Sequence, residues 1–287
     1  MTATDAFVQH RNLLFTVAYE MLGSAAAEDV LQETWLRWAE VERREVRDER
    51  AYLVRIATRL SLNRMRTLAR RRESYVGPWL PEPLLTTPDV AEDVELADSV
   101  STAMLLVLET LSPTERAVFV LREVFDLPYD EIAAAVDKSP AAVRQVAHRA
   151  RQHVDARRPR AAVTARERDE VIARFLGAAA TGDLQGLMDV LAPDVVLLTD
   201  GGGVKKAALR PIHGRDKVTR FLEAVMPEGY AADVLVVNGS PALRIAVDGE
   251  VDAVASLLVE DGRVTGLYIV RNPAKLARLD GVVALTR

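Results

Sequence analysis

The chain has no cysteine and only four histidines among its 287 residues. Without cysteine there can be no disulfide bond, no thiolate zinc site and no cysteine nucleophile. The histidines do not fall in a metal-binding spacing such as His-Glu-x-x-His, since they stand at His10, His148, His153 and His213. We therefore expect neither a metal nor any other cofactor.

Long apolar runs are also missing. No stretch is long and apolar enough to cross a membrane, and the first ten residues, MTATDAFVQH, lack the basic start and apolar run of a signal peptide. We expect a cytoplasmic protein with no membrane contact. Hydrophobic residues make up 49% of the chain, enough for packed cores in two or three domains.

The net charge of −5 would by itself disfavour a nucleic-acid partner. The charge is segregated, however. Residues 55–72 contain seven arginines and no acid, whereas residues 74–111 contain seven acids and no lysine or arginine. The local patches therefore matter more than their sum.

Residues 112–152 have the pattern of a helix-turn-helix. Ser112, Pro113 and Glu115 form a capping box with proline at the first helical position, which predicts a helix start. A short helix is expected over about residues 129–136, and Ser139 caps the last helix.

The last helix of this segment has two different sides. Apolar residues at helical spacing indicate its buried side: Val143, Ala147, Ala150 and Val154. The other side carries donor-rich side chains of the kind that reach bases and phosphates in a major groove: Arg144, Gln145, His148, Arg149 and Arg151. We predict that this side and the capping Ser139 bind DNA. A helical hairpin with a solvated charged face would show the same pattern.

Residues 11–72 help to decide between a DNA-binding helix and a solvated helical hairpin. Their text YEMLGSAAAEDVLQETWLRW, followed by AYLVRIATRLSLNRMRTLARRRE, resembles region 2 of extracytoplasmic-function sigma factors, and residues 112–152 then resemble region 4 in the expected order. The resemblance implies two all-α domains and a protein that directs promoter-specific transcription initiation, without being an enzyme. It implies core RNA polymerase, through its clamp coiled coil and flap, and promoter DNA as partners.

Asp29, Gln32 and Glu33 share one face of a helix expected over about residues 27–39, because they are spaced i, i+3 and i+4. In the family, the equivalent positions dock on the clamp coiled coil of the polymerase. The resemblance therefore implies that these three residues bind polymerase.

The seven arginines lie in a second helix, expected over about residues 51–72, and form an electrostatic footprint for a phosphate backbone. A basic solvated helix is the alternative. With the family's promoter-contacting positions, this gives a second predicted DNA-binding set: Arg55, Arg59, Asn63, Arg64 and Arg66. The family captures an unstacked base in the loop at 42–49. No base preference follows here, because that loop has mixed charges and Arg59 replaces a frequent asparagine.

The last part of the chain, from about residue 164, changes from helical to strand patterns. Strands are expected over 194–200, 232–238, 242–247, 250–259 and 263–271, with hairpin turns at Asp248-Gly249 and Asp261-Gly262. Helices followed by an antiparallel sheet indicate an α+β fold. The pattern resembles the cone-shaped SnoaL-like domains of the nuclear-transport-factor-two superfamily, which enclose a pocket.

The order of these segments along the chain resembles one group of extracytoplasmic-function sigma factors that carries such a domain as a fused C-terminal extension. This resemblance predicts region 2 at 1–73, an acidic proline-containing linker at 74–99, region 4 at 100–158 and the SnoaL-like domain at 164–287. The group's signatures are WLPEPL in the linker, DGGG, and NPxKL. They mark the predicted docking residues Trp79, Leu80, Pro81, Glu82, Pro83, Asp200, Gly201, Gly202, Gly203, Asn272, Pro273, Lys275 and Leu276.

We expect the C-terminal domain to restrain the sigma domains by an intramolecular contact, with the glycine loop as a small exposed surface. The lysine that usually follows the glycines is either Lys205 or Lys206. Two alternatives stay open. The chain could be a one-component DNA-binding regulator whose C-terminal domain senses a ligand, or an isomerase-type enzyme using Asp200 or His213 as acid or base.

Overall fold

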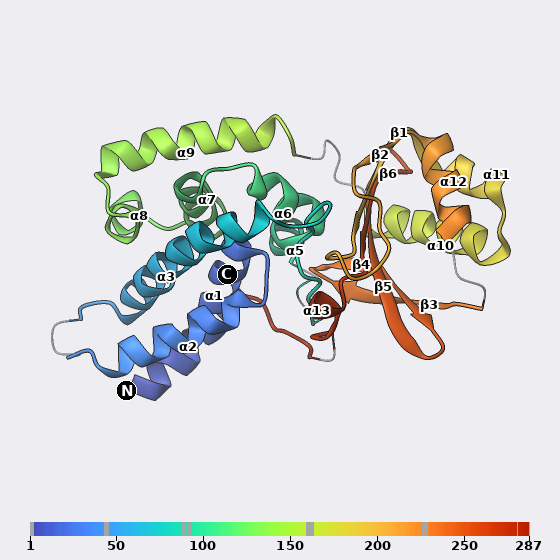
Figure 1. The fold of residues 1–287 in the computed structure, drawn as a ribbon. Helices are drawn as coiled ribbons and strands as arrows, with labels where there is room; N and C mark the ends of the chain where they lie inside the picture. Colours follow the sequence, from blue (N-terminus) through green and yellow to red (C-terminus); the bar gives the residue numbers. More distant parts are fainter. Residues whose placement is uncertain are drawn as a thin grey trace.

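The structure is a computed structural model that describes residues 3–42, 46–87, 90, 93–158, 164–225, 229–279 and 281–286 (Figure 1). Residues 43–45 of the expected base-capturing loop, and parts of the linker at 88–92, lie outside these ranges. No helix in the described ranges is long and apolar enough to cross a membrane.

The chain begins with three helices, α1 (Ala3–Leu22), α2 (Ala26–Ala39) and α3 (Glu49–Arg72). The predicted helices at 27–39 and 51–72 are confirmed to within two residues. One side of α2 is buried and consists of Ala27, Val30, Leu31, Thr34 and Trp38. The Trp38 indole also donates to the Ala3 carbonyl at 2.9 Å, which ties the start of α1 to the end of α2.

A second helical group follows the linker: α5 (Val94–Val100), α6 (Thr102–Glu109), α7 (Pro113–Phe119), the π-turn η2 (Val120–Val124), α8 (Tyr129–Val136) and α9 (Pro140–Asp155). The predicted capping box at Ser112 is present with both of its hydrogen bonds. The Ser139 hydroxyl accepts from the Ala142 amide and caps α9. The helix-turn-helix is thus confirmed.

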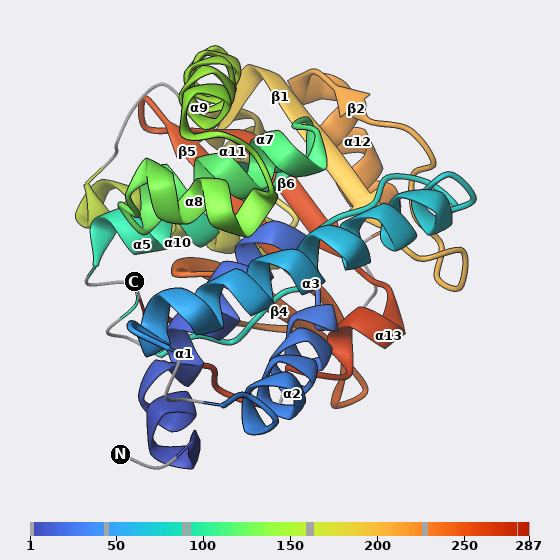
Figure 2. The same ribbon diagram turned by 90° about the vertical axis from the view of Figure 1, so that its left-hand side faces the viewer.

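The two helical groups share one hydrophobic core. Helix α3 lies against α7 and α8, so the second group packs on the first (Figure 2). The linker does not hold the two helical groups apart. Part of the linker is helical, as α5, and the two helical groups bury apolar side chains against each other. Leu285, near the C-terminus, is buried in the same core.

The C-terminal domain has helices α10 (Ala165–Thr181), α11 (Leu184–Val190), α12 (Arg215–Val225) and α13 (Pro273–Leu276). Its strands are β1 (Leu191–Asp200), β2 (Ile212–His213), β3 (Ala231–Val237), β4 (Ser240–Val247), β5 (Glu250–Glu260) and β6 (Arg263–Val270). The predicted α+β class is confirmed. The turns Asp248-Gly249 and Asp261-Gly262 are confirmed too, with positive φ at all four residues.

The sheet order is β2-β1-β6-β5-β4-β3. Strands β3 to β6 pair antiparallel as expected, whereas β1 pairs with β6 in parallel. These two strands are far apart in the sequence, so no hairpin turn fixes their direction. A third Asx-Gly turn, Asn238-Gly239, joins β3 to β4, again with positive φ at both residues.

The sheet is covered on both faces. Helices α10, α11 and α12 pack on one face and form the domain's own core (Figure 1). The other face carries a separate apolar cluster in which Val237 and Val270 of the sheet meet Leu80 of the linker and Leu276 of α13. Leu106 of α6 packs against this cluster. The second face is therefore the one that meets the linker and the two helical groups.

A buried polar cluster lies inside the helical part. Glu20 of α1 is fully buried and accepts a hydrogen bond from Ser99 of α5 at 2.9 Å. Arg116 of α7 is 1% exposed, donates Nε to the Glu20 carbonyl at 2.8 Å, and pairs with Glu109 of α6. Burial raises the pKa of the Glu20 carboxyl to about 8, although Ser99 and Arg116 act in the opposite direction.

This pKa predicts a pH dependence of stability. Glu20 has a reference pKa of 4.5, so the packed form holds an extra proton between pH 4.5 and about pH 8. The contribution of protonated Glu20 to stability is complete below pH 4.5. It is lost as the pH rises through this window and is absent above about pH 8. In the native protein the free energy of unfolding should fall by up to about 1.4 kcal/mol per pH unit within this window, and Glu20→Gln should abolish this fall. Denaturant titrations at several pH values on both proteins test this. Equal pH slopes in both would contradict it.

Candidate functional site: the junction around Asp200 and Asn238

Asp200, at the end of β1, is fully buried and its carboxylate has four donors. Oδ1 accepts from the Tyr75 hydroxyl at 2.6 Å and the Gly202 amide at 3.0 Å. Oδ2 accepts from the Leu80 amide at 2.9 Å and from Lys275 Nζ at 2.7 Å. Two of these donors come from the linker and two from the C-terminal domain. The expectation that Asp200 is exposed was wrong, because β1 ends on the sheet face that the linker covers.

Lys275, in α13, supplies the positive charge of this site. It is 5% exposed, and its Nζ lies 4.1 Å from the Trp79 ring centroid and 5.3 Å from that of Tyr75. Its Nζ also donates to the Leu80 carbonyl. From the sequence, either Lys205 or Lys206 was expected to act beside the glycine loop. The lysine that contacts Asp200 is Lys275, whereas Lys205 pairs with Asp252 at 3.0 Å.

Close backbone approach explains two glycines of the DGGG segment. A Cβ atom on Gly202, whose φ is +61°, would lie 2.3 Å from Asn272 Nδ2. A Cβ on Gly201 would lie 2.2 Å from the Lys205 carbonyl oxygen. Asn272 donates to the Tyr75 hydroxyl at 2.8 Å and accepts from the Ala274 amide to cap α13. The DGGG and NPxKL segments are therefore packed directly against each other.

Burial and the neighbouring Asp200 carboxylate raise the pKa of the Tyr75 hydroxyl. The tyrosine thus stays protonated and donates to Asp200. Tyr75 was not among the predicted site residues. Nothing in its local sequence marks it, because its partners are 125 and 197 residues away.

Asn238, in the β3–β4 turn, forms a second point of attachment. Its side chain is buried, and Oδ1 accepts from the Tyr19 hydroxyl at 3.0 Å and from the Leu84 amide at 2.9 Å. Its Nδ2 donates to Thr102 Oγ1 at 3.3 Å. One side chain thereby joins α1, the linker and α6. Burial, and secondarily the charge of Glu82, raises the pKa of the Tyr19 hydroxyl, which remains a donor.

Gly239, next in this turn, lies directly against α5. A Cβ atom on it would lie 2.7 Å from the Ala97 Cα, and its φ is +68°. Its amide donates to Thr86 Oγ1 at 3.1 Å. The Asn-Gly pair is a strong hairpin signal in the sequence. It predicts the turn but not the contact of this turn with α5.

The linker also continues the sheet at the β3 edge. The Thr86 amide donates to the Val236 carbonyl at 3.0 Å, and the Val283 amide of the C-terminal tail donates to the Leu85 carbonyl at 2.8 Å. The linker thus lies between β3 and the tail. This arrangement satisfies its backbone groups in a buried place.

Glu82 connects the linker to the start of α2. Its carboxylate accepts from the Ala25 amide at 2.7 Å, which caps a helix whose own N-cap residue has no side-chain bond. Burial raises the pKa of Glu82, against the effects of that amide and of Lys275. Of the other predicted docking residues, Leu80, Pro81, Pro83 and Leu276 are buried, whereas Gly203 and Pro273 are exposed.

The predicted polymerase-binding residues lie together on the exposed side of α2. Asp29, Gln32 and Glu33 are all exposed. Glu33 pairs with Arg37 at 2.7 Å within the helix, and Asp29 pairs with Arg64 of α3. A predicted DNA-binding residue is therefore in contact with a predicted polymerase-binding one.

The other predicted DNA-binding residues divide between α3 and α9. On α3, Arg55 lies over the Tyr52 ring, while Arg66 and Asn63 are exposed and bond to each other. Arg59 donates to the Ala134 carbonyl of α8 at 2.9 Å. On α9 every member is exposed: Ser139, Arg144, Gln145, His148, Arg149 and Arg151. The structure keeps the two sets on separate helices, with α8 in contact with the first.

Asp200 and His213 are not brought together. His213 is exposed in β2 and pairs with Val196, four residues or about 13 Å along β1 from Asp200. With four donors on its carboxylate, Asp200 has no free position for a substrate proton. The described residues contain no cluster that could hold a metal ion.

Comparisons with known proteins agree with this arrangement. Family models match at residues 6–71, Sigma-70 region 2, and at residues 101–154, Sigma-70 region 4. The chain is 37% identical to the ECF RNA polymerase sigma factor SigJ of Mycobacterium tuberculosis, covering 94% of this chain and 91% of that protein. It is 33% identical to the probable ECF sigma factor SigI of the same species, covering 94% and 93%.

Among solved structures, the crystal structure of M. tuberculosis SigJ matches with a TM-score of 0.78 at 34% identity. The match covers 96% of this chain and 99% of that one, and so includes the C-terminal domain.

A double-mutant cycle tests the Asp200–Lys275 pair. Lys275→Met leaves a carboxylate buried without its cation and should cost about 3–5 kcal/mol of unfolding free energy. Adding Asp200→Asn removes the stranded charge, so the double variant should be more stable than the sum of the two single effects predicts. Thermal and denaturant unfolding measure the four proteins. Strictly additive effects would show that the two charges are not coupled.

Proposed function

Because this chain belongs to the extracytoplasmic-function family of sigma-70 factors, we propose that it binds core RNA polymerase through Asp29, Gln32 and Glu33, and promoter DNA through α3 and α9. We propose further that its C-terminal domain holds the sigma domains in a packed, restrained state. Polymerase then has to compete with the intramolecular contact. The observation that carries this proposal is the Asn238 side chain, which joins α1, the linker and α6.

The packed state involves several of the groups proposed for function. Arg59 is bonded to α8, and Arg64 is paired with Asp29. Both interactions must open if these arginines are to meet phosphates. An exposed ion pair contributes little, about 0–1 kcal/mol, so the larger barrier lies in the packing of the domains.

Covalent tethering makes the restraint effective. A short flexible connection gives an effective concentration that is roughly millimolar, so even weak docking is populated. Here the docking surface includes an apolar cluster, and its burial favours the closed form further. Core polymerase shifts the equilibrium only by binding the open form more tightly than the closed one.

The alternatives have less support. A stand-alone repressor would have no use for the acid-amide face of α2. An isomerase would need an accessible acid or base, and the Asp200 carboxylate is saturated. The curated relatives are named as sigma factors, which initiate transcription and are not enzymes.

Charge reversal at Glu33 tests the polymerase contact. Glu33→Lys should lower the affinity for core polymerase about tenfold or more, since it reverses a central charge of the proposed interface. Glu170→Lys is the matched control. Glu170 is also exposed and also forms an i,i+4 pair with an arginine, Arg166, but lies in α10. Titration of labelled sigma factor with core polymerase gives both affinities. Equal affinities for the two variants would refute the assignment.

Two turn glycines allow a test of the restraint that leaves every proposed polymerase and DNA contact intact. Gly239→Ala puts a Cβ into α5, whereas Gly262→Ala puts one into open space in a turn of the same kind. Both variants carry similar backbone strain, about 1 kcal/mol, so their difference reports the docking. Gly239→Ala alone should expand the free protein in small-angle scattering and change run-off transcription with core polymerase. Identical behaviour of the two variants would rule out restraint by this contact.

A further inference from the structure

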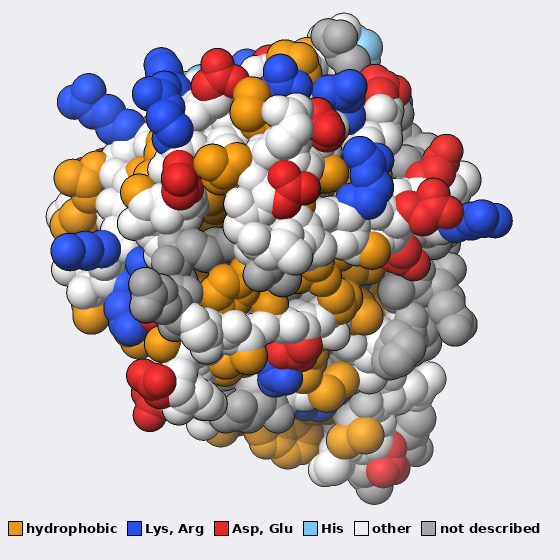
Figure 3. All heavy atoms as spheres, turned by 90° about the vertical axis from the view of Figure 1, so that its right-hand side faces the viewer, with side chains coloured by type: hydrophobic (Ala, Val, Ile, Leu, Met, Phe, Trp, Pro, Cys, Tyr) orange, Lys and Arg blue, Asp and Glu red, His pale blue; other side chains and the backbone are white. Residues whose placement is uncertain are grey.

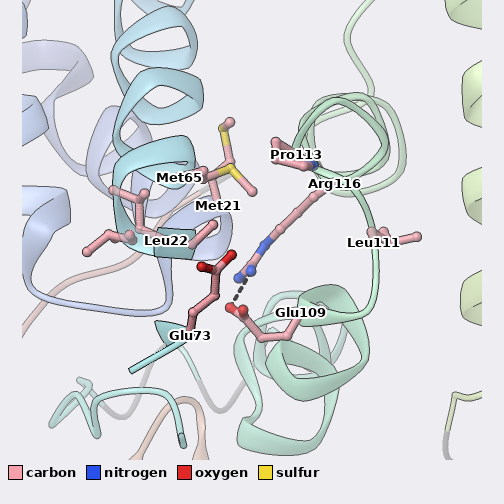
Figure 4. Close-up of a pocket in the computed structure, with 10 residues that line it drawn as sticks. Met21, Leu22, Met65, Glu73, Glu109, Leu111, Pro113 and Arg116 are labelled. Atoms are coloured by element: carbon pink, nitrogen blue, oxygen red, sulfur yellow. Dashed lines mark hydrogen bonds and ion pairs between the residues drawn. The ribbon is translucent and has the colours of Figure 1, made fainter. Parts of the chain in front are cut away.

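A pocket of about 440 Å³ lies where α1 and α3 meet α6 and α7 (Figure 4). This volume is within the range of small-molecule sites. The walls are mostly apolar, with Met21 and Leu22 from α1, Met65 and Leu68 from α3, and Pro113 from α7. We call it the junction pocket, because the first and second helical groups each supply part of its wall.

Arg116 gives the pocket a specific polar group. Its Nε donates to the Glu20 backbone carbonyl and its Nη1 to the Glu109 carboxylate. Its Nη2 is buried, and no hydrogen-bond partner for it is found among the residues that the structure describes. Leaving a buried charged donor unsatisfied is costly, about 1–3 kcal/mol or more. In Figure 4 the guanidinium extends between the apolar wall and the carboxylates of Glu73 and Glu109. An acceptor atom in the pocket would remove this penalty.

The remaining polar wall limits the charge of a ligand. An organic anion would place its charge beside the carboxylates of Glu73 and Glu109, which line the pocket. An organic cation would face Arg116 and would offer no acceptor to Nη2. A neutral acceptor avoids both conflicts, and the methionine and leucine side chains favour an apolar body.

We propose that the junction pocket binds a small neutral amphipathic molecule whose carbonyl or hydroxyl oxygen accepts from Arg116 Nη2. Its apolar part contacts Met21, Met65 and Leu68. Because the wall is made by both helical groups, the ligand binds the packed state and not the separated one. Binding therefore stabilises the packed state by mass action. This consequence rests on the proposed function, in which the packed state is the restrained one.

The binding test uses the full chain and three probes of similar length. Octan-2-one has a neutral acceptor, octanoate is an anion, and octylammonium is a cation without an acceptor. Saturation-transfer NMR and calorimetry should show saturable binding of octan-2-one, about tenfold or more tighter than either charged probe. Absent or non-saturable binding of the ketone, or equal binding of the three probes, would overturn the proposal. The pocket would then be a water-filled gap between the two helical groups.

A pocket-filling variant locates the site. Ala69 is exposed and lines the pocket, so Ala69→Trp should weaken ketone binding about tenfold or more. Thr67→Trp, on the same helix but outside the pocket lining, should leave it unchanged. Ala69→Phe repeats the comparison with a smaller side chain if the tryptophan variant does not fold. Ketone binding that is indifferent to Ala69 substitution would place the ligand elsewhere and overturn the assignment.

The regulatory consequence has its own readout. At a ketone concentration of about ten times its Kd, the affinity of the native chain for core polymerase should fall about tenfold. Unchanged affinity in the presence of bound ketone would overturn the coupling. A failure of the proposed restraint itself appears separately, in the Gly239→Ala comparison, which uses no ligand.

Discussion

A carboxylate placed in an apolar interior must be given donors, and much of this structure follows from meeting that condition at Asp200. Strand β1 ends at this residue, where no solvent reaches the carboxylate. Tyr75 and the Leu80 amide come from the linker, and Lys275 comes from the segment after β6. Removing the linker would leave the charge pair short of donors. The linker is thereby part of the C-terminal domain's structure as much as of the sigma domains'.

The same face of the sheet explains why the domains stay together. Val237, Val270, Leu80 and Leu276 form an apolar cluster with contributions from both sides of the interface. Separation would expose this surface to water, at about 25 cal/mol for each Å². The Asn238 turn and the C-terminal tail add polar and backbone bonds at its edge. A partner that opens the molecule has to compensate for all of these contacts.

The packing also fits the proposed restraint of two different functions. The acid-amide face of α2 remains exposed, so under this proposal polymerase meets it first. Arg59 and Glu82 of the linker are already engaged inside the molecule. Through Glu82, the linker even caps α2, so the helix that we assign to polymerase is stabilised by the segment that docking holds in place. Encounter and opening can thus be separate steps of one binding reaction.

Local signals in the sequence determined the helices and most turns. The capping box at Ser112, the shared exposed face of Asp29, Gln32 and Glu33, and the two Asp-Gly turns all depend on residues within about one turn of each other, so they could be read directly. The family texts identified the sigma domains for the same reason. Only the tertiary structure decided that Asp200 is buried, that Lys275 is its partner, and that β1 runs parallel to β6. It also decided that Asn238 meets Tyr19, 219 residues away. Such contacts depend on which surfaces exclude water together, and no periodicity or spacing along the chain carries that information.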